Sequence, residues 1–280
     1  MLDQKVDTVR HWRQRLRILR FRRRDQTLMR KHRAMYQLRL HRGELLFAIL
    51  LPLAFNLWLL LGLDELIGLW RDVLDYLVPK LDFNAAVVMR AVNLGFYDLW
   101  IPTVIVEGTL PSAVTWWVTA AVCLVAFVLS YLIKPDRGLP FIYILRATIL
   151  LQATALLYFA FIPASFPQVL EAYVVNNLFM GICLIALIPW ILGATYYLFD
   201  FSLLQKIALT LLIMLFFIVA LPLQYLLHAN LIAHGSLLFM PLLYLMFGLF
   251  VDVMAFVALY SYGMSWRFEK VMVLRRHSDR

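Results

Sequence analysis

Residues 44–63 read ELLFAILLPLAFNLWLLLGL, and this long apolar stretch decides the class of protein. A helix rises ~1.5 Å per residue, so about 20 apolar residues cross the ~30 Å hydrocarbon layer of a bilayer. Five further stretches of similar length and character follow, which predicts an all-α, polytopic transmembrane helical bundle with six spans. The predicted spans are residues 44–63, 112–133, 141–162, 176–198, 207–227 and 236–262.

The composition of the whole chain agrees with this prediction. Of the 280 residues, 63% are hydrophobic and only 15% are charged, and the mean hydropathy is +0.79. A soluble domain of this size is closer to half apolar, so the excess excludes an ordinary water-soluble domain. Cys123 and Cys183 both lie inside apolar stretches, where they are expected to be small buried hydrophobic residues rather than a disulfide.

Charged residues are unevenly distributed along the chain. Residues 1–43 hold 14 of the 26 Lys and Arg against three acidic residues, a local net charge of +11. The other 237 residues hold 12 basic and 14 acidic residues, a net charge of −2. This pattern divides the chain into a basic arm (1–43), a six-span membrane domain (44–266) and a basic tail (267–280).

Basic residues in short loops indicate which side of the membrane is cytoplasmic. By this rule the arm, the turn 134–138, the turn with Lys206 and the tail are cytoplasmic, while the predicted outer loops 163–175 and 228–235 contain no Lys or Arg. We therefore expect a multi-pass protein of the cytoplasmic (inner) membrane with both termini in the cytoplasm. The lack of an Asn-x-Ser/Thr site agrees with a bacterial membrane.

The arm mixes arginine with apolar residues at helical spacing, as Trp12, Leu16 and Leu19 show. Such a basic amphipathic helix is predicted to lie on the anionic lipids of the cytoplasmic leaflet, and a docking site for an acidic protein partner is the alternative. Nucleic-acid binding is not expected, because no recognisable module accompanies the charge. The arm residues predicted to contact lipid or a partner are Arg13, Arg15, Arg17, Arg20, Arg22, Arg23 and Arg24.

The predicted outer loop 64–111 begins with DELIGLWRDVLDYLVPKL, which places Leu66, Ile67 and Leu74 on one helical face and charged residues on the other. This pattern predicts an amphipathic helix that lies along the outer leaflet. The loop is expected either to cover the bundle or to offer a docking surface. The aromatic residues predicted at the outer interface are Trp70, Trp100, Trp116 and Trp117.

Two ionisable residues fall inside predicted spans, and an ionised group there costs at least ~2.5–3.5 kcal/mol. Arg146 lies six residues, ~9 Å, into the third span, and Asp252 lies 16 residues, ~24 Å, from the outer start of the sixth. Because an arginine side chain can cover the remaining difference in depth, we expect the two to face each other in a polar pocket that Gln152 joins. This pocket is predicted either to fix the packing of the helices or to bind a proton, an ion or a lipid headgroup.

Catalytic signatures are absent from the sequence, which has no metal-ligand spacing, no nucleophile motif and no phosphate-binding glycine loop. No metal and no cofactor are therefore expected. Glu107, Glu171, His228 and His234 are the outer residues that acid–base chemistry would require, although ordinary solvated roles are expected for them.

Three functions follow as hypotheses. The first is a non-enzymatic subunit of a larger membrane assembly, such as a cell-envelope complex that makes or exports a surface polysaccharide. The second is a small proton-coupled secondary transporter built on Arg146 and Asp252. The third is a lipid-modifying enzyme with its site in the outer loops. The sequence identifies neither a substrate nor a protein partner.

Overall fold

The computed structural model describes residues 42–81, 85–93, 95, 97–106, 108–133, 135–163, 166, 169–196 and 202–278. Within these ranges, side chains are described between residues 46 and 133 and between 138 and 265. The seven arginines predicted to form the binding face of the basic arm lie outside the described residues.

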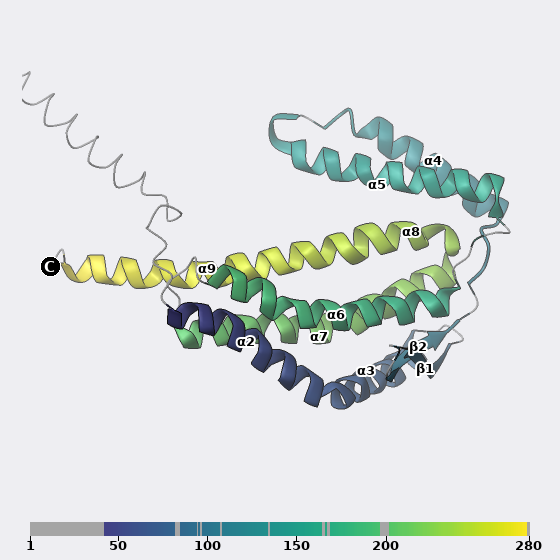
Figure 1. Ribbon diagram of the computed structural model, residues 1–280. Helices are drawn as coiled ribbons and strands as arrows, with labels where there is room; N and C mark the ends of the chain where they lie inside the picture. Colours follow the sequence, from purple (N-terminus) through teal and green to yellow (C-terminus); the bar gives the residue numbers. More distant parts are fainter. Residues whose placement is uncertain are drawn as a thin grey trace, which may run out of the picture.

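The described chain is almost entirely helical. Its long helices are α2 (Arg42–Leu61), α3 (Leu63–Leu77), α4 (Ala113–Leu129), α5 (Pro135–Phe161), α6 (Leu170–Tyr196), α7 (Leu203–His234) and α9 (Val251–Ser278). The last span is composite, because α9 is preceded by the short elements η4 (Leu237–Phe239), α8 (Met240–Leu242) and the π-helix η5 (Leu243–Phe250). Helical segments run alternately between two ends of the molecule, so that α2 begins at the same end at which α9 finishes (Figure 1).

Four helical segments are long and apolar enough to cross a membrane: Gly138–Phe161, Leu170–Tyr196, Leu203–His234 and the composite Leu237–Ser265. The pair α2 and α3 passes the same test only together, and it is bent by 59° at Gly62, so it counts as a fifth span if it crosses as one unit. The remaining helix, α4, has only 17 residues. The chain is thus a multi-pass helical membrane protein, with four or five candidate spans in its described part.

Two helices extend beyond the predicted span boundaries. Helix α7 continues to His234, so most of the predicted outer loop 228–235 is helix. Helix α6 begins at Leu170, six residues before the predicted start of the fourth span. The hydropathy falls at polar residues near these two ends, Glu171 on α6 and His228 on α7, although His228 is buried and hydrogen-bonded within the bundle.

The segment 64–111 contains α3 as predicted, with Leu66, Ile67, Trp70 and Leu74 on its buried face. It also contains an antiparallel β-hairpin, which the all-α prediction missed. Strand β1 (Ala86–Asn93) pairs with β2 (Asp98–Ile105), in a register that sets Arg90 opposite Ile101. At the turn, Gly95 adopts a positive φ of 89°, and its amide donates to the Asn93 side chain. The two short strands lack the strict alternation of apolar and polar residues that is typical of a strand with one exposed face.

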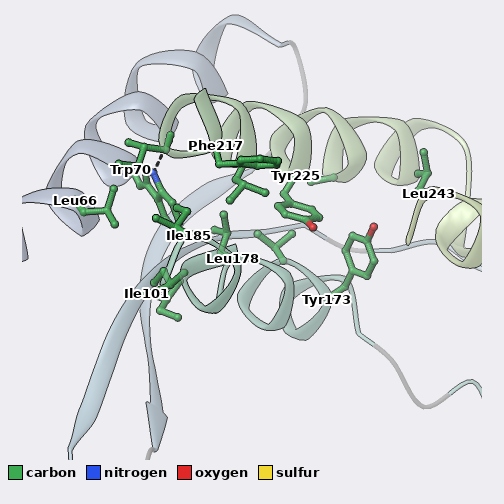
Figure 2. Packing of buried hydrophobic residues seen from close by; sticks show 14 of the residues in the cluster. Leu66, Trp70, Ile101, Tyr173, Leu178, Ile185, Phe217, Tyr225 and Leu243 are labelled. Atoms are coloured by element: carbon green, nitrogen blue, oxygen red, sulfur yellow. Dashed lines mark hydrogen bonds between the residues drawn. The ribbon is translucent and has the colours of Figure 1, made fainter. Parts of the chain in front are cut away.

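The core lies where α6 and α7 pack on each other and on α2, α3 and β2 (Figures 1 and 2). Trp70 is fully buried there, and its indole Nε1 donates to the carbonyl oxygen of Ile218 on α7 at 2.8 Å (Figure 2). Strand β2 buries Leu99, Ile101 and Val104 beside the same helices. The amphipathic face of α3 is therefore covered by protein.

Helices α4 and α5 form a separate antiparallel hairpin. It diverges from α9 along most of its length (Figure 1). On the body of the protein, α5 packs chiefly against η4 and α8, where Gln152 donates to the carbonyl of Leu238 at 3.3 Å. Within the hairpin, Trp116 donates to the carbonyl of Leu156 at 2.9 Å. Most of the large apolar side chains of α4 are exposed, as expected for a helix surrounded by lipid.

Candidate functional site

The structure does not bring Arg146 and Asp252 together as an ion pair. The ion pairs of the described residues are Arg71 with Asp75 and Arg90 with Glu171. Arg146 instead belongs to the α4–α5 hairpin, where its Nε donates to the hydroxyl of Ser130 at 3.2 Å and its guanidinium lies over the ring of Tyr131 at 4.6 Å.

Gln152, the third residue of the predicted pocket, is buried where α5 meets η4. Its amide nitrogen is bound to Leu238, while its Oε1 is one of two buried side-chain oxygens without a hydrogen-bond partner among the described residues. The predicted pocket is thus replaced by separate polar sites, and Asp252 belongs to the largest of them.

Asp252 is 7% exposed and lies at the first turn of α9, directly after the π-helix. Its carboxylate lies close to the side-chain amide of Gln224 on α7. The same amide nitrogen, Gln224 Nε2, donates to the backbone carbonyl of Phe247 at 2.8 Å. Since a primary amide carries two N–H donors, Gln224 can serve both acceptors at once.

His228 lies one turn further along the same face of α7, since it follows Gln224 by four residues. Its Nδ1 is 2.9 Å from the hydroxyl of Tyr173 on α6, and the ring also lies close to the backbone of Phe247. The Phe247 carbonyl can only accept, so the histidine nitrogen facing it carries a proton. Nδ1 of the neutral ring is then the acceptor, and Tyr173 donates to it.

We call these five residues the relay cluster: Tyr173, Gln224, His228, Phe247 (through its carbonyl) and Asp252. Polar contacts connect them in the order Tyr173, His228, Phe247 carbonyl, Gln224, Asp252, and the contacts Tyr173–His228 and Gln224–Phe247 are hydrogen bonds. Tyr225 and Tyr244 flank the cluster, with ring centroids 6.4 Å from that of Tyr173 (Figure 2 shows Tyr173 and Tyr225). The cluster thus joins α6, α7, η5 and α9.

The π-helix explains why the backbone carbonyl of Phe247 can accept a hydrogen bond from a side chain. In an α-helix each carbonyl is occupied by the amide four residues later, whereas the wider i→i+5 turns of a π-helix alter this pattern locally. Phe247 lies within the eight π-helical residues, and its carbonyl accepts from Gln224 and lies close to the ring of His228.

The relay cluster extends from a helix end to the middle of the bundle. Tyr173 lies three residues, ~5 Å, after the start of α6, while Asp252 lies 15 residues, ~22 Å, after the start of the composite span at Leu237. Elsewhere, Thr210 on α7 and Tyr196 on α6 form another polar contact, with oxygens 2.9 Å apart. Gln224 follows Thr210 by 14 residues, ~21 Å, and every side chain between them on α7 is apolar.

Sequence reasoning identified Asp252 but not its neighbours. His228 was placed in a loop, and Tyr173 carried no pattern that distinguished it from other aromatic residues. One signal was available, because Gln224 and His228 are spaced by four residues and would share a face if the fifth span continued past Leu227.

The predicted outer aromatic residues have different environments. Trp70 is buried in the core and Trp116 is half-buried against α5, while Trp100 and Trp117 are exposed. Among the residues considered for catalysis, Glu171 binds Arg90, and this hydrogen bond and the attraction between the two charges raise the pKa of the Arg90 guanidinium. His228 belongs to the relay cluster, His234 Nδ1 lies 3.0 Å from the carbonyl of Asn230, and Glu107 lies outside the described residues.

Within the described ranges, no three His, Cys, Asp or Glu side chains are close enough to hold a metal ion. Comparison with protein-family models, with curated proteins and with solved structures finds no match for this chain.

Proposed function

We propose that the chain is a proton-coupled membrane carrier whose proton-binding centre is the relay cluster. The observation that supports this proposal is the buried carboxyl group of Asp252 in the middle of the composite span, with a second ionisable side chain, His228, in the same cluster of polar contacts. Ionisable residues inside membrane helices are rare, and those that face the bundle interior commonly belong to proton or ion pathways. Compared with the prediction from sequence, Asp252 keeps its role and His228 replaces Arg146.

The physical basis of coupling is the change of charge at Asp252. Adding or removing a proton there changes the cost of keeping the carboxyl group inside the bundle by several kcal/mol, enough to shift an equilibrium between two helix arrangements. The π-helix next to Asp252 offers such an alternative, since a π-turn can revert to α-helix by a shift of one residue in hydrogen bonding. The apolar stretch of α7 between Thr210 and Gln224 would prevent protons from crossing without this change.

Proton flux into liposomes that contain the purified full-length chain tests the proposal. With an inside-negative potential set by valinomycin and a trapped pH-sensitive dye, we expect wild-type protein to acidify the lumen faster than protein-free liposomes do. Asp252→Asn should reduce the rate to that of protein-free liposomes, and Asp252→Glu should restore part of it. Glu65→Gln removes an exposed carboxyl group of α3 and should have no effect. Equal rates for wild type and Asp252→Asn, with equal protein incorporation, would contradict the proposal.

The carrier is proposed to cross the membrane six times, with both termini in the cytoplasm. The alternating helix directions and the charge distribution support this arrangement. It requires α2 with α3 to form one crossing and α4, of 17 residues or ~25 Å, to form another. Reporter fusions at residue 136 and after Arg280 should both be cytoplasmic. If α4 does not cross, the number of crossings is odd, and a reporter after Arg280 will be on the opposite side from the arm.

A second candidate function, a non-enzymatic subunit of a larger membrane assembly, is favoured by the β-hairpin. In the described part of the chain, β1 has a single neighbouring strand, so one of its edges is unpaired. Trp100 and Tyr97 are exposed at the same hairpin, and exposed aromatic residues beside an open strand edge are typical of docking surfaces. Mass measurement after gentle detergent extraction tests this candidate, and a strictly solitary chain would contradict it.

A further inference from the structure

The α4–α5 hairpin contains a groove that is separate from the relay cluster. It has a volume of about 530 Å³, within the range of ordinary ligand pockets, and it is open along its length. Its lining is almost wholly apolar and includes Trp116, Cys123, Phe127, Leu150 and Leu156. Arg146 is the one charged residue of the lining.

Arg146 has no acidic partner among the described residues. Its contacts are the hydroxyl of Ser130 and the ring of Tyr131, and neither neutralises the guanidinium. A guanidinium carries five N–H donors in a planar fork that matches the oxygens of a phosphate group. A cation at the end of an apolar groove therefore complements a ligand with an anionic head and a hydrocarbon tail.

We infer that this groove binds an anionic phospholipid, with one acyl chain between α4 and α5 and the headgroup phosphate on Arg146. A lipid fits better than a protein helix, because a helix with side chains is ~10–12 Å wide and needs a broader surface than two adjacent helices leave between them. The charge distribution also predicts the connection 130–138, near Arg146, to be cytoplasmic, where anionic lipids are concentrated. This inference does not depend on the carrier proposal.

Photo-crosslinking in liposomes tests the inference with the full-length chain. Two probes are compared in vesicles of phosphatidylcholine and phosphatidylglycerol, and each carries a diazirine on one acyl chain: a phosphatidylglycerol probe and a phosphatidylcholine probe. Mass spectrometry then locates the modified residues. We expect the anionic probe to label residues 116–127 and 149–157 about fivefold more than the neutral probe, the preference that one basic residue near anionic lipid supplies.

Three variants identify the cause of the labelling. Arg146→Gln should reduce labelling by the anionic probe to that of the neutral probe, while Arg146→Lys should keep part of the preference. Ala153→Phe fills the groove without changing its charge and should reduce labelling by both probes. Arg71→Gln is the matched control, because Arg71 is exposed on α3 and is paired with Asp75.

Two results would overturn the inference. One is equal labelling by both probes that Arg146→Gln leaves unchanged, which would show that the groove meets only bulk lipid. The other is protection from both probes by a second protein chain in the purified sample. If Arg146→Gln fails to elute as a single folded species, the comparison of Ala153→Phe and Arg146→Lys with wild type decides the question.

Discussion

The α6–α7 pair and the α4–α5 hairpin are both antiparallel pairs of apolar helices, yet their environments differ. Helix α6 buries 14 of its 27 residues, whereas α4 buries only Thr119 among its 17. Lipid and a neighbouring helix are almost equally apolar, so hydropathy alone does not determine which helices pack centrally. The central pair contains buried polar groups such as His228, whose hydrogen bonds lipid chains could not form. It also has close helix contacts at glycines such as Gly193, which lipid chains could not replace.

The largest expected difference is between Trp70, which lies on α3 and packs against the central pair, and Trp117 of the α4–α5 hairpin. Trp70→Ala removes a fully buried side chain and its hydrogen bond to Ile218, and it should lower the free energy of unfolding by about 3–5 kcal/mol. Trp117→Ala, at a side chain that is 69% exposed on α4, should change it by less than ~0.5 kcal/mol. Unfolding by SDS in mixed micelles measures both. A similar loss for the two variants would mean that the hairpin is packed as tightly as the body.

The next effect concerns a close approach between α2 and α6. A Cβ at Gly193 would lie 2.8 Å from Cγ of Pro52 and 2.9 Å from the backbone oxygen of Ala48. A backbone oxygen cannot move without its helix, so Gly193→Ala should force α2 away and lower the free energy of unfolding by about 1–3 kcal/mol. The same micelle titration measures it, and unchanged stability would show that α2 packs on α6 less closely than the structure indicates.

A smaller effect of opposite sign is expected at Gly68 in α3. A Cβ there meets nothing within 4 Å, so alanine fits without a clash. Alanine is favoured over glycine in a helix interior by about 0.8–1.0 kcal/mol, and Gly68→Ala should therefore raise the free energy of unfolding by up to about this amount. Parallel titrations of Gly68→Ala and Gly193→Ala separate helix propensity from packing, because the first effect should be positive and the second negative.

The sequence was sufficient to predict the helical membrane class, because apolar length is a direct measure of what a bilayer can accommodate. It also predicted α3 and its apolar face, since Leu66, Ile67, Trp70 and Leu74 recur at helical spacing. It did not show that protein covers this face, because the spacing of apolar residues tells which side of a helix avoids water and not what lies against it. The predicted location of α3 at a membrane interface stays a prediction.

The candidate site was harder to predict. Depth along two helices can be read from residue numbers, but rotation about the helix axes and the choice of neighbouring helices cannot, so the sequence does not show that Arg146 contacts Ser130 and Tyr131 rather than Asp252. The relay cluster depends on the π-helix η5, and no residue pattern within Leu243–Phe250 predicts π-helical rather than α-helical backbone hydrogen bonds. The β-hairpin was missed because short strands beside long apolar helices give a weak signal.

The smallest expected effect on stability is also the one that best separates structure from function. Tyr173→Phe removes the hydroxyl that donates to His228, and such bonds between membrane helices contribute ~0.6 kcal/mol on average. Tyr143→Phe, at an exposed tyrosine of the α4–α5 hairpin, is the matched control and should leave stability unchanged. If His228 helps to bind the transported proton, Tyr173→Phe, which removes its hydrogen-bond partner, should change proton flux into liposomes severalfold, far more than so small a loss of stability explains. A purely structural role for the cluster predicts instead that flux and stability change in proportion, because fewer folded molecules would be the only cause.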